Sequence, residues 1–453
     1  MMRLLFCSKS YPIFGGVERW LSDLCEHLPG YGYETIIALE QGSRFNNARA
    51  YHSAYPHLNV VTMKSLTGTA VGRRLAAESV IRKVKPDIVI PVLAHDAYVA
   101  AVTLKALGNK HRIVYAIHEL NPAAFGEIRE YSPDTDMVVC VNRLSMKICQ
   151  MLCGVSPERI RHIRCGVPLP LKTETRACMH SIHIGFVGRL QQIQKRIFDL
   201  QKLCEELDRR QVSFKLSIAG AGFDEDRLIQ LLDKYIRSGK VIFRGQMTNE
   251  QLSTDFYPRI DALIITSEWE TGPIVAWEAM ANGTAIITSS FRGLKAEDTL
   301  RHNKNALVFD IGDMSQAAEH VLALMNNKAL IQELGQAGRQ TAQEYLTLEE
   351  MIIAWRDLLA EVLTRNPIKS GNVPSMPSQS GRLEKWGIPI RFSEFLRKIA
   401  FRRFIHSSVR AEWPFYAECD QDFSKSFYRA VIELDRAGCL QAAGRHRANQ
   451  AVS

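Results

Sequence analysis

Several features that define common protein classes are missing from this chain of 453 residues. Its ten cysteines include no CxxC pair, and the closest two are Cys149 and Cys153, so we expect neither a zinc ribbon nor a disulfide framework. The opening residues MMRLLFCSKSYPIFGG contain too short an apolar run for a signal peptide. No stretch reaches the roughly 18 apolar residues that a membrane-spanning helix needs. These absences predict a cytoplasmic protein with reduced thiols.

Complete phosphate-binding and nucleic-acid motifs are missing as well. There is no G-x-x-x-x-G-K-[ST], which excludes a P-loop, and the glycines Gly15 and Gly16 in YPIFGGVERW lack the rest of a G-x-G-x-x-G fingerprint. Glycines without a side chain still let the backbone approach a phosphate or a sugar closely. No recognised nucleic-acid motif accompanies the basic residues, so nucleic acid is not an expected partner.

The chain carries a net charge of +9 and has a pI of about 9.0, which favours an anionic partner. A large part of this excess lies at the carboxyl end. From residue 366 onward there are 14 Lys and Arg against 8 Asp and Glu, a net charge of +6. The anionic partner therefore need not bind only where the chemistry takes place.

Short β-rich runs alternate with helical patterns through most of the chain, as in RLLFCS, then GVERWLSDLCEHL, then YETIIAL. Such alternation predicts parallel sheets with right-handed crossovers. The pattern pauses at a turn-rich stretch and restarts with IHIGFVG, which predicts two doubly wound, Rossmann-like domains that face a cleft. The expected parts are a domain over 1–168, a linker over 169–180, a domain over 181–345, a helix over 346–365 that packs back toward the first domain, a flexible linker over 366–381, and a basic helical extension over 382–453.

The stretch SEWETGPIVAWEAMANG carries the two acids Glu270 and Glu278 around a turn that opens an apolar helix. A carboxylate at the end of a strand, or on the flank of the following helix, can accept hydrogen bonds from sugar or ribose hydroxyls. The amides from Thr271 to Ile274 are expected to be free at the helix start, where they suit anionic or hydroxyl ligands. The simpler alternative makes Glu270 a helix-terminal charge and leaves Glu278 half exposed.

A second segment, GFVGRLQQIQKRIFDL, places Arg189 and Lys195 between a strand and a helix. Amides at a helix start and two cations would hold a diphosphate. The alternative interpretation is an ordinary strand–loop–helix connection with solvated basic residues. The glycines of SIAGAG, Gly220 and Gly222, end the next strand and are interpreted as a turn.

Together these segments resemble the GT4 family of retaining glycosyltransferases with the GT-B fold. ETGPIVAWEAMANG is similar to the family's E-x7-E motif, FVGRL…QKR to its phosphate-binding segment, and FGGVE to its amino-terminal glycine loop. The resemblance covers roughly residues 3 to 365. The chain departs from the family pattern at Thr271, where a glycine is usual, at Thr284, where proline is frequent, and in the spacing of Lys195 from Arg189.

The resemblance implies a role for each matching position. Glu270 would contact donor sugar hydroxyls, Glu278 would contact the ribose, and Arg189 and Lys195 would neutralise the leaving diphosphate. Further donor contacts would come from Gly16, Thr271, Gly272, Pro273 and Ile274. His118, in VYAIHEL, would lie near the reacting sugar, and the implied catalytic set is Glu270, His118, Arg189 and Lys195. Without the resemblance, His118 would be taken for a loop histidine with satisfied hydrogen bonds.

The implied reaction is transfer of a hexose from a nucleotide diphosphate sugar to a hydroxyl acceptor, with the anomeric configuration retained and with neither a metal nor a cofactor. The first domain would bind the acceptor and the second the nucleotide sugar. Asp134–Asp136 (DTD) is similar to the metal-binding DxD of the other major glycosyltransferase fold, but it precedes an apolar run where a metal motif should follow one, so we interpret it as a loop acid pair. Two alternatives stay open, a nucleotide-sugar epimerase of the same fold and a non-catalytic nucleotide-sugar-binding scaffold.

The segment IRFSEFLRKIAFRRFIHSSV, in the extension, has apolar residues at helical spacing with basic residues beside them, over 391–405. Such a helix can lie in an anionic membrane surface, or it can dock on the protein itself with its charges in water. The membrane interpretation favours a lipid-linked acceptor, as in surface polysaccharide or lipopolysaccharide assembly, and a peripheral location on the inner face of the membrane.

Overall fold

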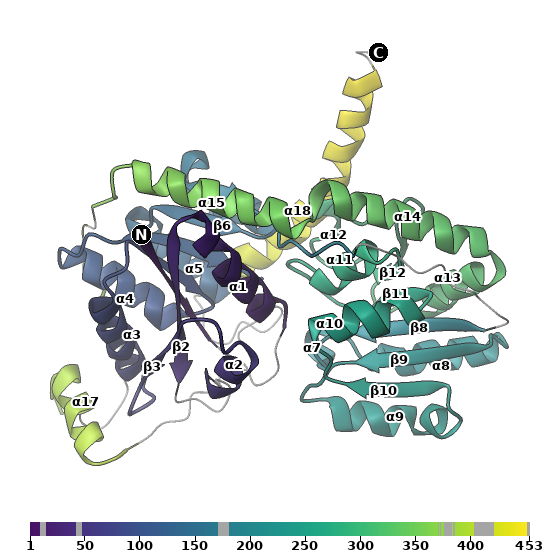
Figure 1. Cartoon of the computed structure of the whole chain (residues 1–453), viewed down its shortest axis with the longest axis horizontal. Coiled ribbons are helices and arrows are strands. Elements are labelled where there is room, and N and C mark those ends of the chain that lie inside the picture. The colour runs from purple at the N-terminus through teal and green to yellow at the C-terminus, as the bar shows by residue number, and fades with distance from the viewer. Residues whose placement is uncertain are drawn as a thin grey trace. The chain divides into compact units, whose positions relative to one another are not determined.

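A computed structural model of the chain forms two compact units, each built around one parallel β-sheet (Figure 1). The first unit comprises Met1–Val141, Ser145–Ile163 and Ile352–Arg429, and the second comprises Asn142–Leu144, Arg164–Met351 and Ala430–Ser453. The structure describes residues 1–9, 15–41, 48–170, 181–369, 371, 373–375, 383, 386–402 and 421–450, and within the last range the side chains of 422–437. Most of the two predicted linkers, and residues 403–405 of the predicted basic helix, lie outside these ranges.

The first sheet has seven parallel strands in the order β3-β2-β1-β4-β5-β6-β7. Their bounds are β1 (Met2–Ser8), β2 (Tyr33–Gln41), β3 (Val60–Lys64), β4 (Ile88–Val92), β5 (Arg112–Ile117), β6 (Met137–Cys140) and β7 (Ile160–His162). β4 and β6 are buried along their whole length, because helices cover both faces of a parallel sheet. The strand order reverses direction between β1 and β4, so the sheet is doubly wound from that point.

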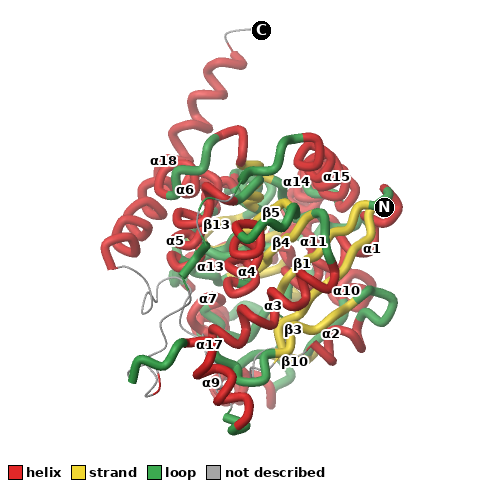
Figure 2. The backbone as a smooth tube through the Cα atoms, turned by 90° about the vertical axis from the view of Figure 1, so that its left-hand side faces the viewer, coloured by secondary structure: helices red, strands yellow, loops and turns green. Residues whose placement is uncertain are grey.

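Helices follow the strands of this sheet: α1 (Gly16–His27), α2 (Ala48–Ala54), α3 (Ala70–Val84), α4 (His95–Ala106), α5 (Pro122–Tyr131) and α6 (Arg143–Leu152), with short 3-10 helices at Leu28–Tyr31, Ser132–Asp134 and Pro157–Arg159. α3 begins where the Thr69 hydroxyl accepts a hydrogen bond from the Gly72 amide. α4 packs on α3, β4 and β5, and Figure 2 shows α3 and α4 on the same side of the sheet.

The second sheet has six parallel strands in the order β10-β9-β8-β11-β12-β13. Their bounds are β8 (Ile182–Val187), β9 (Phe214–Ala219), β10 (Val241–Gly245), β11 (Ala262–Ile265), β12 (Ala285–Ser289) and β13 (Leu307–Phe309). The accompanying helices are α7 (Gln192–Lys195), α8 (Asp199–Arg209), α9 (Glu225–Arg237), α10 (Asn249–Gln251), α11 (Ile274–Ala281), α12 (Leu294–Glu297), α13 (Met314–Asn326) and α14 (Lys328–Tyr345), with a π-helical turn at Leu252–Phe256 and a 3-10 helix at Tyr257–Arg259.

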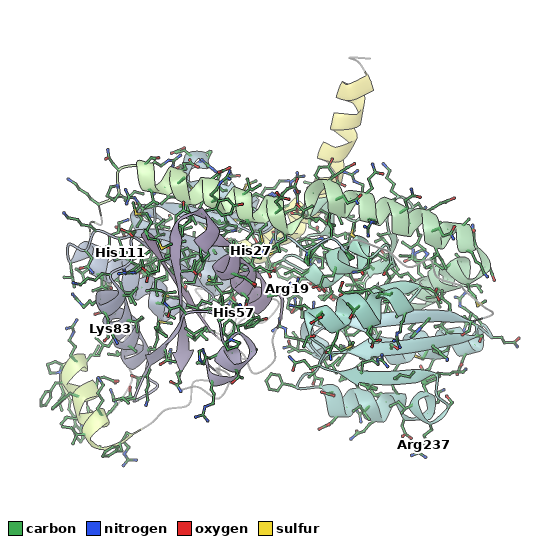
Figure 3. All side chains as sticks on the ribbon, viewed as in Figure 1. Arg19, His27, His57, Lys83, His111 and Arg237 are labelled. Atoms are coloured by element: carbon green, nitrogen blue, oxygen red, sulfur yellow. The ribbon has the colours of Figure 1, made fainter. Side chains whose placement is uncertain are left out.

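The helix α9 illustrates how an amphipathic sequence packs on the sheet. It buries Leu228, Leu232 and Tyr235 along one stripe, and its last residue, Arg237, points into solvent (Figure 3).

Three more helices complete the described chain: α15 (Leu348–Thr364), α17 (Ile390–Ile399) and α18 (Gln421–Gln450). From Ile352 onward α15 belongs to the first unit, where Trp355 is fully buried against Trp20 of α1. α17 and the start of α18 also belong to the first unit, and the rest of α18 belongs to the second. The prediction of two Rossmann-like units with a helical carboxyl-terminal extension is confirmed. Among the described helices, none combines the length and the apolar character needed to cross a bilayer.

Candidate active site

Arg189, Lys195 and Glu270 of the second unit follow the two strands between which the strand order of its sheet reverses. β8 and β11 are neighbours in the sheet although they are far apart in sequence, so the connections that leave their carboxyl ends run in opposite directions. Gly188 and Arg189 follow β8 directly, and the segment from Thr266 to Glu270 follows β11. In doubly wound sheets, this reversal is the usual position of a ligand.

Lys195 and Glu270 meet at this position as an ion pair. The Lys195 ammonium lies 2.6 Å from Oε1 of Glu270, and the side chains are only 14% and 6% exposed. The Ser267 hydroxyl donates a second hydrogen bond to the same carboxylate oxygen, at 2.6 Å. A charge withdrawn from water is tolerated when an opposite charge and hydrogen bonds compensate it. Lys195 is therefore not a solvated loop cation, and Glu270 is not merely a charge at a helix end.

Three hydrogen bonds to backbone carbonyls fix the short helix α7, which carries Lys195, to the loop after β11. The Thr266 hydroxyl donates to the Lys195 carbonyl at 2.5 Å, and the Glu268 amide donates to the Gln194 carbonyl at 2.8 Å. The buried Gln194 side chain donates in turn to the Trp269 carbonyl at 3.2 Å. The two sequence segments that carry the cation and the acid thus behave as one structural element.

Arg189 is linked to this element through Gln194 as well. Its guanidinium donates to the Gln194 side-chain oxygen at 3.1 Å, and the arginine is partly exposed. The loop that carries Arg189 rests on the glycines of the next strand end. A Cβ at Gly220, whose φ is +140°, would lie 1.9 Å from the Gly188 carbonyl oxygen. Gly220 is therefore needed for the close approach of the two strand ends, because a side chain at this position would clash with the Gly188 carbonyl.

Glu278 lies on α11 and is 7% exposed, so the half-exposed alternative is wrong. Its Oε2 accepts a hydrogen bond from the Tyr257 hydroxyl at 2.7 Å, and Tyr257 is itself fully buried. Tyr257 comes from the 3-10 helix Tyr257–Arg259, before β11. The two glutamates of the motif therefore have different partners, a lysine for Glu270 and a tyrosine for Glu278.

The start of α11 differs from the expectation that its amides are free. Pro273 has no N–H, and the Ile274 amide donates to the Gly272 carbonyl at 2.8 Å, so that amide is already engaged. The prediction is wrong for these two positions because the chain makes a tight turn before the helix begins. The amides of Thr271 and Gly272 come before this turn, and the Thr271 carbonyl accepts from the Asn142 side chain at 2.9 Å.

Comparisons with known proteins identify the family of the chain. Residues 14–170 match the model for Glycosyltransferase Family 4, and residues 176–341 match the model for Glycosyl transferases group 1. The chain belongs to the GT4 family of glycosyltransferases. Among curated relatives, the transferase is similar to the N-acetyl-alpha-D-glucosaminyl L-malate synthase of Bacillus anthracis, with 21% identity over 388 residues, 80% of this chain and 98% of the relative.

Solved structures show that the fold is GT-B. The transferase resembles Anabaena Alr3699/HepE, solved in complex with UDP and glucose, with a TM-score of 0.64 and 16% identity over 80% of this chain and all of that one. It also resembles the lipopolysaccharide outer core galactosyltransferase WaaB in its apo form, with a TM-score of 0.60 and 18% identity over 80% of this chain and all of that one. At these identities the likeness supports the fold alone.

The first unit of the transferase contains the two remaining predicted site residues, Gly16 and His118. Gly16 is the first residue of α1, the helix from which Figure 3 labels Arg19 and His27. One turn after Gly16, the Trp20 ring lies edge-on to the His118 ring, with centroids 4.2 Å apart. His118 directly follows β5 and is 8% exposed, and this burial lowers its pKa to about 3. At neutral pH it is a neutral imidazole.

The DTD segment has a structural role. Asp136 is buried, and its Oδ2 accepts from the Lys105 ammonium at 2.5 Å and from the Ile113 amide at 2.8 Å. These contacts support its interpretation as a loop acid rather than a metal ligand. Within the described part of the chain, no group of three or more His, Cys, Asp and Glu side chains is arranged to hold a metal ion.

Sequence reasoning missed the residues that hold the predicted ones in place: Ser267, Gln194, Tyr257 and Asn142. Ser267 and Gln194 stand inside the quoted motifs, but a serine or a glutamine at such a position carries no signal of its own. Tyr257 and Asn142 come from other segments, and only the fold brings them to the site.

Proposed function

We propose that the transferase moves a hexose from a nucleotide diphosphate sugar to a hydroxyl acceptor, with retention of the anomeric configuration. The observation that carries this proposal is the buried Lys195–Glu270 pair, with Arg189 nearby, at the strand reversal of the second sheet. Cations suit the diphosphate and a carboxylate suits sugar hydroxyls, so the two charges correspond to the two halves of such a donor.

On donor binding, the diphosphate competes with Glu270 for the Lys195 ammonium. The carboxylate, still held by Ser267, is then available to accept hydrogen bonds from the hydroxyls of the hexose. Its pairing with Lys195 before binding keeps a buried charge compensated until the ligand arrives. Glu278, oriented by Tyr257, accepts from the ribose, and the amides of Thr271 and Gly272 contact the sugar.

In the reaction, the bond between the anomeric carbon and the diphosphate oxygen breaks as the acceptor oxygen attacks from the same face. The departing phosphate takes the acceptor's proton, so no side chain acts as nucleophile. Negative charge grows on the leaving diphosphate, and Lys195 and Arg189 stabilise it, which is the work that a metal ion performs in other transferases. The neutral His118 serves as a hydrogen-bond donor and not as a second cation.

For the acceptor, we propose a lipid-linked or surface-polysaccharide glycan. The support is the name of one similar structure, a lipopolysaccharide outer core galactosyltransferase. For the donor, the complex of HepE with UDP and glucose makes UDP-sugars the first candidates to test. Such an acceptor places the reaction in the cytoplasm, at the inner face of the membrane.

A donor screen followed by product analysis tests the function. Melting temperature is measured with UDP-, GDP- and ADP-hexoses, because a ligand that binds only the folded state raises it. The donor that stabilises the protein is then incubated, radiolabelled, with wild type and with Glu270→Gln. With no acceptor added, we expect the wild type to transfer the hexose slowly to water, releasing the free sugar and the nucleoside diphosphate, and we expect roughly a hundredfold loss of this hydrolysis in the variant. Formation of an epimer, or stabilisation without turnover, contradicts the proposal and supports one of the two alternatives.

A further inference from the structure

The helix α17 is attached to the first unit through its polar side. Glu394 is 1% exposed, and its carboxylate accepts hydrogen bonds from the hydroxyls of Thr69, at 2.8 Å, and Thr67. Ser393 and Arg397 are buried beside it, and the Arg397 guanidinium lies 3.9 Å from Glu394. The helix is docked on the protein, but the expectation that a docked helix keeps its charges in water is wrong for Glu394 and Arg397, which are buried.

The apolar residues of the same helix point the other way. Phe392, Phe395 and Ile399 recur at helical spacing and are 53%, 55% and 60% exposed. Just outside the helix, Trp386 is 74% exposed and Phe401 is 85% exposed. A helix on a globular protein normally buries its apolar stripe and exposes its polar side. In α17 the polar side is buried and the apolar stripe is exposed. Exposed large apolar side chains gathered in one place mark an interaction site.

Three cations accompany these side chains. Arg391, Lys398 and Arg402 are exposed, whereas the one acidic residue between 386 and 402, Glu394, is buried. We call Trp386, Arg391, Phe392, Phe395, Lys398, Ile399, Phe401 and Arg402 the α17 surface. Two copies of it would repel each other, because each presents positive charge without a matching acid. An anionic bilayer offers both an apolar layer and negative charge.

We propose that the α17 surface docks the protein on an anionic membrane, with the aromatic and aliphatic side chains in the headgroup boundary and the three cations on lipid phosphates. This proposal goes beyond the sugar-transfer reaction and does not depend on it. The surface lies in the extension, outside the residues 14–170 and 176–341 that match the family models. The membrane contact would therefore be a property added to the shared catalytic fold.

Co-sedimentation of the full chain with vesicles tests the proposal. Vesicles of phosphatidylcholine alone are compared with an equal mixture of phosphatidylcholine and phosphatidylglycerol. We expect binding to the anionic mixture only, and a loss of roughly tenfold or more in Phe392→Ser/Phe395→Ser. Both phenylalanines are exposed, so this variant keeps its fold. Tyr345→Ser is the matched control, because Tyr345 is 56% exposed at the end of α14.

Charge is tested separately. Arg391→Gln/Lys398→Gln should weaken binding roughly twenty-five-fold, at about fivefold for each cation removed near a membrane surface. Arg82→Gln/Lys83→Gln removes two exposed cations at the far end of α3 and should leave binding unchanged; Lys83 is labelled in Figure 3. Equal weakening by both pairs, unchanged binding of the phenylalanine variant, or self-association through this surface in sedimentation velocity would overturn the proposal.

A second, independent observation concerns Asp435 of α18. This aspartate is 5% exposed, its Oδ1 accepts a hydrogen bond from the Gly293 amide at 3.0 Å, and its Oδ2 lies 4.0 Å from the Arg292 guanidinium. Burial raises its pKa, and its contacts with the Gly293 amide, Arg292 and Lys295 act in the opposite direction. A carboxylate from the extension is thus used to hold one particular backbone amide.

The Gly293 amide belongs to a loop that is hydrogen-bonded through its backbone to the segment carrying Glu270. The Arg292 amide donates to the Glu268 carbonyl at 2.9 Å, and the Glu270 amide donates to the Arg292 carbonyl at 3.3 Å. Gly293 has a φ of +103°, and a Cβ there would lie 2.9 Å from the Glu270 carbonyl oxygen. Any shift of the loop therefore moves the backbone of Glu270.

We infer that Asp435 is a positioning residue for Glu270, so that α18 completes the donor site from outside the family's shared fold. The inference rests on the proposed function of Glu270 as a donor-sugar ligand. Because Glu270 bonds Lys195 through its side chain, a displaced backbone would misplace both charges. Small misplacements at a reacting centre lower rates by up to about a hundredfold.

The test compares Asp435→Ala with Asp435→Asn and with Glu433→Ala, which removes an exposed acid two residues away on the same helix. We expect Asp435→Ala to lower kcat/KM for the donor about tenfold, and Asp435→Asn to recover most of it, because its amide oxygen still accepts from Gly293. Unchanged kcat/KM in Asp435→Ala, or a loss that Asp435→Asn fails to recover, would overturn the inference.

Failure of the function itself is recognised separately. If the wild type turns over no donor, calorimetric titration with the nucleotide sugar that stabilises the protein replaces the kinetics. Weaker binding in Asp435→Ala than in Glu433→Ala would then support the positioning role while the transfer reaction fails. Equal binding in the two variants would overturn the positioning role as well.

Discussion

The two units share a topology but place different chemistry at their strand ends. In the second unit a lysine and a glutamate form a buried ion pair at the reversal of the sheet, whereas in the first unit a neutral histidine packs against a tryptophan ring. The Rossmann-like framework is equivalent in both, so it cannot by itself explain the difference. The difference therefore comes from the residues in the loops after the strands.

The largest effect is expected when Lys195, the cation of the buried ion pair in the second unit, is removed. Lys195→Ala should lower kcat/KM for transfer about a thousandfold, because the leaving diphosphate loses a preorganised positive charge. Steady-state kinetics with the donor identified by melting temperature measure the effect. Lys202→Ala, which removes a lysine that is 57% exposed on α8, should leave the rate within about twofold.

A second variant distinguishes a loss of catalysis from a loss of folded protein. Lys195→Ala leaves the Glu270 carboxylate buried without its counter-charge, which destabilises by about 3 kcal/mol. Lys195→Met/Glu270→Gln removes both charges and should restore stability without restoring transfer. A double variant that is stable and still active would remove the ion pair from the catalytic machinery.

The free energy of unfolding should fall at acidic pH because two buried histidines of the first unit are neutral in the folded state. Burial lowers the pKa of His118 to about 3 and that of His111 to about 4, both below the ordinary value of about 6.5. The stabilisation from each neutral ring is complete above that ordinary value and is lost as the pH falls toward the folded-state pKa. At pH 5 the loss is about 2 kcal/mol for each histidine.

Denaturant unfolding at pH 7 and at pH 5 measures this loss. His118→Phe should reduce the difference between the two pH values by about 2 kcal/mol. His57→Phe, at a side chain that is 56% exposed, is the control and should leave the difference as in the wild type; Figure 3 labels His57 and His111. An unchanged pH dependence in His118→Phe would show that the histidine is not held neutral.

The smallest expected effect concerns the hydrogen bond that orients Glu278. Tyr257→Phe removes a hydroxyl that lies 2.7 Å from the carboxylate while keeping the ring that fills the core. Donor affinity should fall about fivefold, the value of one hydrogen bond of about 1 kcal/mol. Calorimetry with the nucleoside diphosphate measures this affinity. An unchanged affinity would show that Glu278 does not bind the ribose.

Much of the fold could be predicted from the sequence, because strands buried on both faces appear as short apolar runs such as IVIPV in β4. Lys195 and Glu270, the cation and acid of the proposed donor site, could also be picked out from the sequence, since they stand in recognisable motifs next to strands. The partners could not. Tyr257 and Asn142 reach the site only through the fold, and Asp435 bonds an amide 142 residues earlier in the chain.

The orientation of α17 shows a different limit. Helical spacing separates the apolar face from the polar face, but it does not tell which face is docked. Two threonine hydroxyls before α3 decide that question by binding Glu394. The same reasoning applies to the start of α11, where a tight turn at Gly272 engages an amide that spacing alone predicts to be free.

Binding of the diphosphate group provides the most direct measurement. Calorimetry compares a nucleoside diphosphate with its nucleoside, in the wild type and in Arg189→Ala/Lys195→Ala. We predict that the wild type prefers the diphosphate by two orders of magnitude or more and that the double variant binds both compounds equally. A double variant that keeps the full preference would show that the phosphates are held elsewhere.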